Sequence, residues 1–194
     1  MKIAITGHKH GLGAALYDKF TIYNRSAGHE VVGFDIEDGQ DIGNKSILGK
    51  IVYNIKDFDV FVNNAYHETG QTEILKYLLK SWQYQPKIIV HIGTFLIKPE
   101  GRAGQGPLEI HKLYVENKLE QQRLIEEYKL KDSKLKIIQI NPGYMITGFL
   151  DKMQVPPLPY GLNAIDCADA IVNAIDLLDK NIYIPEITLM DKRN

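Results

Sequence analysis

The chain has 194 residues, of which 44% are hydrophobic and 24% are charged, and its formal net charge is −1. These values are typical of one globular domain, so we expect a single domain over residues 1–194. The near-neutral charge argues against nucleic acid or a membrane surface as the main partner, and no apolar run is long enough to cross a bilayer. The single cysteine, Cys167, argues against an internal disulfide and a multi-cysteine metal site, so no metal is predicted. Because no signal peptide precedes the first apolar run, we expect a cytoplasmic protein.

Apolar runs of strand length alternate with helix-like stretches along the whole chain. Strands are predicted over residues 3–6, 31–35, 60–63, 88–93, 135–141 and 182–189. Helices are predicted over residues 12–27, 45–54, 72–84, 109–130 and 164–178. This alternation predicts an α/β fold, namely a Rossmann-like, doubly wound, mostly parallel sheet of about six strands with helices on both faces.

The first predicted strand opens into a turn with three glycines, which is followed by a helix. In this arrangement Gly7 permits a tight turn, Gly11 lets the backbone approach a phosphate, and Gly13 lets the helix pack on the strand. The first N–H groups of the helix then face a pyrophosphate. The sequence therefore predicts a dinucleotide site, with contacts from Gly7, His10, Gly11, Leu12 and Gly13.

The second predicted strand ends at Asp35, about 20 residues after the glycine turn. A carboxylate at this place accepts hydrogen bonds from a ribose 2′-OH and repels a 2′-phosphate, so we expect NAD rather than NADP. Only residues 36–40 separate this strand from Asp41 and Ile42, whereas a parallel crossover needs about a dozen residues. The usual third strand and second helix are therefore predicted to be reduced or missing. Asp41 and Ile42 are expected to line the adenine end of the cofactor site.

Further motifs follow the glycine turn in a set order. They are Asn63-Asn64-Ala65, Thr94 at a strand end, Tyr114-x-x-x-Lys118 on the longest helix, and Pro142-Gly143 with Thr147. From Thr6 to Thr147 the pattern resembles that of the short-chain dehydrogenases/reductases. The resemblance implies an NAD(P)-dependent oxidoreductase that interconverts an alcohol and a carbonyl by hydride transfer, acting on a small molecule.

The resemblance also implies a role for each matched residue. Tyr114 would be the acid/base on the substrate oxygen, Thr94 would donate to the same oxygen in place of the commoner serine, and Lys118 would hold the nicotinamide ribose. Cofactor contacts are implied for Asn63, Asn64, Ala65, Tyr114, Lys118, Pro142, Gly143 and Thr147.

The spacing of Tyr114 and Lys118 supports a direct interaction, because residues four apart share one face of a helix. An ammonium about 4 Å from a phenolate, at an effective dielectric constant near 20, is worth roughly 4 kcal/mol. Since one pKa unit corresponds to about 1.4 kcal/mol, the sequence predicts that Lys118 lowers the pKa of Tyr114 by up to roughly three units.

The chain departs from the family pattern in three places. Tyr66 stands where the family has a glycine after Asn-Asn-Ala. No asparagine occurs between Asn64 and Asn117, so the family's asparagine-based proton relay is absent or rebuilt through water, Gln71 or His67. The helix that commonly helps form the family's dimer interface is short here, so the oligomeric state is left open, with a homodimer as the candidate assembly.

Two other functions stay open. The chain is alternatively a catalytically weak NAD(H)-binding sensor, or it performs epimerisation or dehydration of a nucleotide sugar on the same scaffold. The pair Tyr114 and Lys118 favours an enzyme, and the compact glycine spacing disfavours the sugar epimerases. The pocket for the carbonyl or alcohol substrate is predicted from residues 66–71, 95–107 and 144–159.

Overall fold

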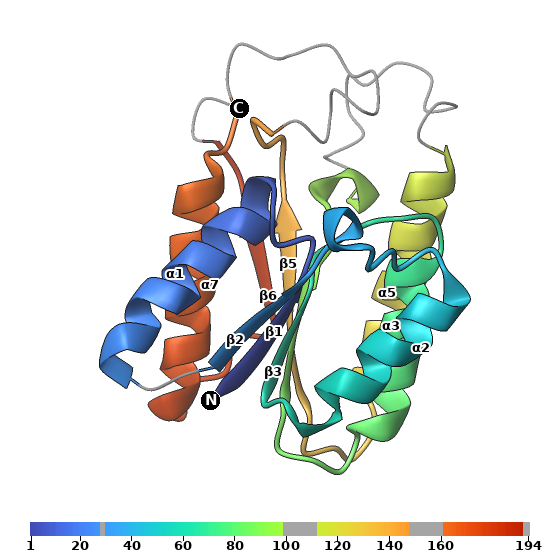
Figure 1. Cartoon of the computed structure of the whole chain (residues 1–194), viewed down its shortest axis with the longest axis horizontal. Helices are drawn as coiled ribbons and strands as arrows, with labels where there is room; N and C mark the ends of the chain where they lie inside the picture. The colour runs from blue at the N-terminus through green and yellow to red at the C-terminus, as the bar shows by residue number, and fades with distance from the viewer. Residues whose placement is uncertain (28–29, 99–111, 148–160, 192–194) are drawn as a thin grey trace.

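The computed structural model describes residues 1–27, 30–98, 112–147 and 161–191. Within them, one sheet has the strand order β2-β1-β3-β4-β5-β6 (Figure 1). The strands are β1 (Lys2–Thr6), β2 (Glu30–Phe34), β3 (Val60–Asn63), β4 (Ile88–Ile92), β5 (Lys136–Pro142) and β6 (Glu186–Leu189). Every pairing in the sheet is parallel, so the carboxyl ends of all strands meet at one edge, the upper one in Figure 1. The predicted α/β class is confirmed.

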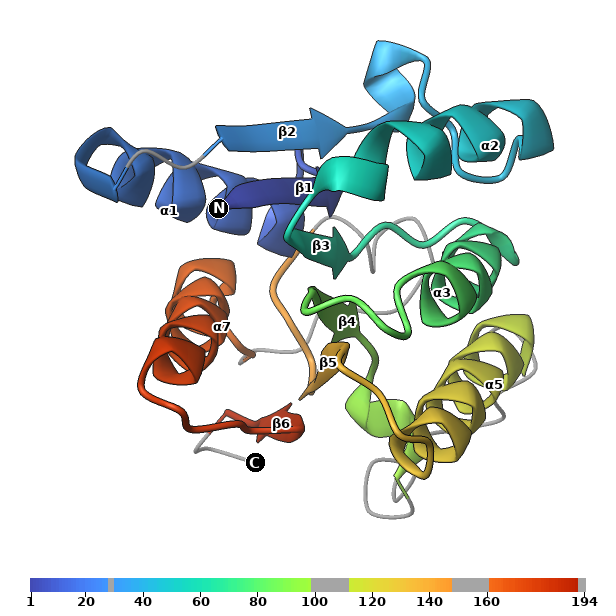
Figure 2. The ribbon, with the colours of Figure 1, turned by 90° about the horizontal axis from the view of Figure 1, so that it is seen from below.

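Helices cover both faces of the sheet. The described helices are α1 (Gly11–Ala27), α2 (Lys45–Asn54), α3 (Gly70–Ser81), α5 (Lys112–Lys129) and α7 (Ala164–Asp179), with 3-10 turns η1 (Ile36–Asp38), η2 (Ile55–Asp57) and η3 (Phe95–Ile97). Helices α1 and α7 lie on one face, and α2, α3 and α5 lie on the other (Figure 2). No helix among the described residues combines the length and the apolar content needed to span a membrane.

The sheet separates two apolar cores. Successive strand residues point to opposite faces, so Phe61 and Ile89 pack under α2, α3 and α5, whereas Val62 and Val90 pack under α1 and α7. All four are fully buried. Burying a side chain of this size contributes roughly 1.5–3 kcal/mol, so the two cores hold the helices against the sheet.

The connection from β2 to β3 is as short as the sequence predicts. It contains one ten-residue helix, α2, and no strand. The helix begins where predicted because the side chain of Asn44 accepts hydrogen bonds from the backbone N–H groups of Ser46 and Ile47. The usual third strand is missing between residues 35 and 59, and the second helix is kept in a short form.

The last strand is shorter than predicted. Residues 182–185, which the sequence predicts as strand, lie before β6. The chain completes the C-terminus of α7 just before them, because the N–H groups of Lys180 and Ile182 both donate to the carbonyl of Leu177, at 3.0 and 2.9 Å. Helix α7 itself begins at the cap provided by Asn163, as its sequence predicts. The predicted start of α5 near residue 109, and the pocket segments 99–107 and 148–159, lie outside the described residues.

Candidate functional site

The glycine turn lies where the strand order reverses. The chain leaves β1 toward β2 on one side and returns to β3 on the other, and open parallel sheets bind ligands at the carboxyl edge beside such a reversal. Gly7 has a φ of +70°, which favours glycine, and a Cβ on Gly13 would lie 1.9 Å from the carbonyl oxygen of Gly7. The turn is therefore tight enough to place the N-terminus of α1, whose first N–H groups lack intrahelical partners, at this edge.

The segment after β3 holds the glycine turn in place. The hydroxyl of Thr6 accepts hydrogen bonds from the N–H groups of Asn64 and Ala65, each at 3.0 Å, and the amide of Asn64 donates to the Thr6 carbonyl at 2.9 Å. A Cβ on Gly7 would lie 3.2 Å from the Cβ of Ala65. These two predicted cofactor residues thus form the wall of the turn.

The residues after β5 approach the same turn from the other end of the chain. A Cβ on Gly11 would lie 3.3 Å from Cγ2 of Thr147. Pro142 ends β5 inside the protein, and Gly143 donates its N–H to the carbonyl of Leu189 at 2.8 Å. The structure therefore brings Thr147 to the glycine turn, while Pro142 and Gly143 anchor the loop that carries it.

Asp35 has a second role that its position alone did not indicate. Its carboxylate accepts hydrogen bonds from the N–H of Glu37 at 3.1 Å and from the N–H of Lys9 at 3.2 Å, and only 4% of the residue is exposed. Asp35 therefore caps η1 and ties it to the glycine turn. Around it, Lys9 pairs with Asp38, and His10 pairs with the more exposed Glu37.

The predicted adenine end is only partly as expected. Asp41 accepts hydrogen bonds from His67 at 2.5 Å and from the N–H of Gly43 at 2.8 Å. Burial alone would raise the pKa of Asp41, but these two bonds and the charge of His67 together outweigh it and lower the pKa. The side chain of Ile42 lies in the core instead of at the edge, with 4% exposed. Among the described residues, no group of three or more His, Cys, Asp or Glu side chains is arranged to hold a metal ion.

Tyr114, Lys118 and Thr94 come together at the carboxyl edge. Thr94 follows β4, and its hydroxyl is hydrogen-bonded to the phenol of Tyr114. The Lys118 Nζ lies 5.5 Å from the centroid of the Tyr114 ring and 5.8 Å from that of Tyr66. Tyr66 follows Ala65 directly, so this group lies beside the wall of the glycine turn.

The predicted effect of Lys118 on Tyr114 is wrong for this structure. Burial is the main cause that raises the pKa of Tyr114 to about 12; the hydrogen bond with Thr94 opposes this shift, and the neighbouring Tyr66 adds to it. Burial also lowers the pKa of Lys118 to about 7, so the amine carries only part of a charge at neutral pH. In addition, the amine donates to two acceptors other than the phenol. The helical spacing predicts that Tyr114 and Lys118 are close together. It reveals neither the burial of both groups nor the other two acceptors of the amine.

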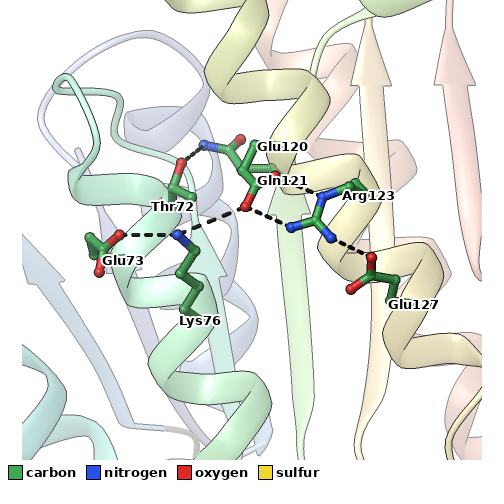
Figure 3. Close-up of polar contacts among 7 residues, drawn as sticks. All are labelled: Thr72, Glu73, Lys76, Glu120, Gln121, Arg123 and Glu127. Atoms are coloured by element: carbon green, nitrogen blue, oxygen red, sulfur yellow. Dashed lines mark hydrogen bonds and ion pairs between the residues drawn. The ribbon is translucent and has the colours of Figure 1, made fainter.

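Lys118 belongs to a layer of buried polar side chains between the sheet and helices α3 and α5. We call it the polar layer; its members are Asn63, Gln71, Thr72, His91, Lys118 and Gln121, which are each at most 3% exposed. Gln121 donates to the hydroxyl of Thr72 at 2.8 Å, as Figure 3 shows, and its oxygen lies 3.1 Å from Nε2 of His91. Burial, followed by the nearby Lys118, lowers the pKa of His91 to about 3, so this imidazole is neutral.

Asn63, the last residue of β3, has its side chain in this layer. It is fully buried, and its amide donates to the carbonyl of Gln71 at 3.0 Å and contacts Nδ1 of His91 at 3.3 Å. The side chain of Asn63 therefore faces the polar layer, while its predicted place behind a cofactor stays a prediction. The signal for the layer was present in the sequence, since His91 interrupts an otherwise apolar strand and Gln121 lies one helical turn after Lys118.

Above the polar layer, the outer surfaces of α3 and α5 are charged. Lys76 pairs with Glu73 and Glu120, and Arg123 pairs with Glu120 and Glu127 (Figure 3). Such exposed pairs each contribute about 0–1 kcal/mol, so they stabilise the helices little.

Solved structures match this fold over nearly the whole chain. A short-chain dehydrogenase/reductase from Vibrio parahaemolyticus is 19% identical, with a TM-score of 0.68 over 96% of this chain and 98% of that chain. An alcohol dehydrogenase from Thermococcus sibiricus, complexed with 5-hydroxy-NADP, is 19% identical, with a TM-score of 0.69 over 100% and 98%. A 3-ketoacyl-(acyl-carrier-protein) reductase from Brucella melitensis, complexed with NADH, is 15% identical, with a TM-score of 0.70 over 99% and 97%. No protein-family model and no curated protein matches the sequence.

At 15 to 19% identity these likenesses concern the fold. They agree with the single parallel α/β sheet of this chain. The chain therefore has the fold of the short-chain dehydrogenases/reductases.

Proposed function

We propose that this chain is an NAD(P)-dependent oxidoreductase that interconverts an alcohol and a carbonyl. The observation that carries the proposal is the meeting of Tyr114, Thr94 and Lys118 beside the glycine turn. Tyr114 and Lys118 come from α5, and Thr94 comes from the end of β4, 20 residues before Tyr114. Three of the matching structures in the previous section are named as a dehydrogenase or a reductase, and two of those are bound to a nicotinamide cofactor, which supports the same reaction class.

The residues around the glycine turn fit a dinucleotide. Gly7 and Gly13 leave no room for side chains, so backbone N–H groups at the start of α1 are what the turn presents to a phosphate. Ala65 and Thr147 would flank the cofactor, and Lys118 would hold its nicotinamide ribose. The bound cofactor would supply the hydride, and the protein would orient it and control the proton.

The proton would come from Tyr114. With a pKa of about 12 the phenol is protonated at neutral pH, which suits a donor to the carbonyl oxygen in the direction of reduction. Thr94, which is already hydrogen-bonded to the phenol, would donate to the same oxygen. After the proton transfer Tyr114 becomes a phenolate, whose free energy is high in this partly buried place. The charged form of Lys118 beside the ring would stabilise this phenolate.

We propose NAD as the preferred cofactor, with NADP disfavoured. Asp35, Glu37 and Asp38 follow β2, where a 2′-phosphate would otherwise lie. Lys9 is the cation that would attract such a phosphate, and its pairing with Asp38 balances its charge. Asp41 and Ile42 are proposed to form the adenine end of the site, with the side chain of Ile42 turned into the core.

The substrate is proposed to be a small carbonyl or alcohol, without nucleic acid or membrane as a partner, and the protein to act in the cytoplasm.

Two measurements test the proposal against the alternatives. Calorimetry with NAD and NADP tests the cofactor site, and we expect binding with a preference for NAD. Oxidation of NADH is then followed with a panel of aldehydes and ketones. Binding without turnover on any of them would favour the NAD(H) sensor, and conversion of a nucleotide sugar without net NADH oxidation would favour the epimerase or dehydratase.

A further inference from the structure

The amine of Lys118 has a side-chain partner that the family resemblance does not assign. Its Nζ donates to Oε1 of Gln71 at 2.6 Å and to the carbonyl oxygen of Ile92 at 2.7 Å. Gln71 lies in the first turn of α3 and is fully buried. The bond therefore lies out of reach of competing water, where a hydrogen bond to a charged group is strong.

The orientation of the Gln71 amide is fixed by its other contacts. Its Nε2 donates to the carbonyl of Asn63 at 2.8 Å and to that of Ile92 at 3.2 Å, while the backbone carbonyl of Gln71 accepts from the Asn63 amide at 3.0 Å. Both amide hydrogens thus point at carbonyl oxygens. The oxygen is left to face Lys118, and a flipped amide would set N–H groups against N–H groups.

These contacts determine how many N–H groups of Lys118 remain for other partners. An ammonium has three N–H groups, of which Gln71 and Ile92 accept two. One N–H remains for a group near the rings of Tyr114 and Tyr66, both within 6 Å of Nζ. The titratable side chains that face the amine are these two tyrosines and His91 on β4, and His91 is neutral.

We propose that Gln71 is the positioning residue of Lys118: its amide oxygen holds the amine beside Tyr114 and stabilises the charged form that Tyr114 needs. Gln71 does not itself carry a proton, because an amide does not titrate near neutral pH. It takes the place of the missing asparagine relay as a fixed acceptor. The inference rests on the proposed function only for its catalytic consequence.

The test measures the pKa of Lys118 directly, in protein without cofactor, by NMR of 13Cε-labelled lysine with Lys118→Met to assign the signal. Gln71→Met removes the acceptor and should lower the pKa of Lys118 by about one to two units. Gln71→Glu places a carboxylate there and should raise it by about one to three units. Gln121→Met is the matched control, because it removes an equally buried amide from the same layer without touching Lys118, and it should leave this pKa in place.

Each outcome decides the proposal. Opposite shifts in the Met and Glu variants, absent from the control, support it. An unchanged pKa in Gln71→Glu, or equal shifts in Gln71→Met and Gln121→Met, overturns it. If Gln71→Met does not fold, Gln71→Glu alone carries the decision. Where turnover is detected, its pH profile should shift with the pKa of Lys118; absence of turnover in every variant would count against the proposed function and leave the NMR result intact.

Discussion

The ring of Tyr66 packs edge-on against the ring of Tyr114, with the centroids 4.8 Å apart and the planes at 78°. A glycine at this position, as in the family pattern, would leave the phenol of Tyr114 more open to water. Tyr66 thus covers one side of the Tyr114 ring, and it is one of the causes that raise the pKa of Tyr114.

Replacing Tyr66 should therefore change the titration of Tyr114. Tyr66→Gly is expected to bring the pKa of Tyr114 down from about 12 toward its ordinary value of 10.0, because solvation of the phenolate improves. Tyr66→Phe keeps the ring and should shift the pKa much less. NMR of ring-labelled tyrosine measures both. Equal shifts in the two variants would show that the hydroxyl of Tyr66, and not its ring, sets the value.

Replacing glycine by alanine should lower stability at Gly13, in the glycine turn, and raise it at Gly49, in α2. Gly13→Ala places a Cβ 1.9 Å from the carbonyl oxygen of Gly7, so the backbone must move; we expect a loss of about 1–3 kcal/mol of stability together with weaker NAD binding. Gly49→Ala lies in α2 with nothing within 4 Å of the new Cβ and should gain about 0.4–1 kcal/mol. Urea unfolding measures both. A Gly13→Ala protein as stable as the wild type would contradict the described turn.

The buried imidazole of His91 predicts a loss of stability in acid. Its pKa is about 3 in the folded protein and 6.5 when solvated, so below pH 6.5 the unfolded chain binds more protons than the folded one. The stability contributed by neutral His91 is complete above pH 6.5 and is lost as the pH falls toward 3. In this window the wild type should lose about 1.4 kcal/mol per pH unit more than His91→Gln, as measured by urea unfolding. If the unfolding free energies of the wild type and His91→Gln changed with pH in the same way, the neutral, buried state of His91 would be contradicted.

The acidic group after β2 predicts a change in cofactor preference. Asp38→Asn removes the partner of Lys9 and a carboxylate 3.8 Å from His8, so NADP affinity should rise several-fold relative to NAD, less so at high salt. Asp35→Ala should weaken NAD binding and relatively favour NADP. Asp59→Asn, next to Lys2 at the opposite edge of the sheet, is the control. Calorimetry with both cofactors measures the ratio, and an unaltered ratio in Asp38→Asn would remove this carboxylate from the specificity argument.

Local patterns were enough to predict much of the fold. The bounds of α2 follow from the cap at Asn44, and the parallel sheet follows from alternating strand and helix patterns. The absent third strand follows from the few residues between Asp35 and Asp41, because chain length limits a crossover regardless of sequence. Spacing on one helix likewise predicts that Tyr114 and Lys118 are neighbours.

The parts that sequence reasoning got wrong depend on contacts between distant segments. The pKa of Tyr114 is set by burial and by Tyr66, 48 residues earlier in the numbering, and not by the lysine on its own helix. Gln71 was one of three alternatives for the missing asparagine, and only its place across from Lys118 distinguishes it from His67. The contacts of the Asn63 side chain with Gln71 and His91 likewise join segments that are distant in the sequence.

The central claim is that Tyr114 is the proton donor beside a bound nicotinamide cofactor, and Tyr114→Phe tests it most directly. NADH oxidation is measured on the best carbonyl of the panel for the wild type, for Tyr114→Phe and for Tyr77→Phe, whose ring is 45% exposed on α3. We expect Tyr114→Phe to bind NADH nearly as tightly as the wild type but to turn over roughly 10² times more slowly or worse, with Tyr77→Phe unchanged. Equal rates for Tyr114→Phe and the wild type would contradict the account.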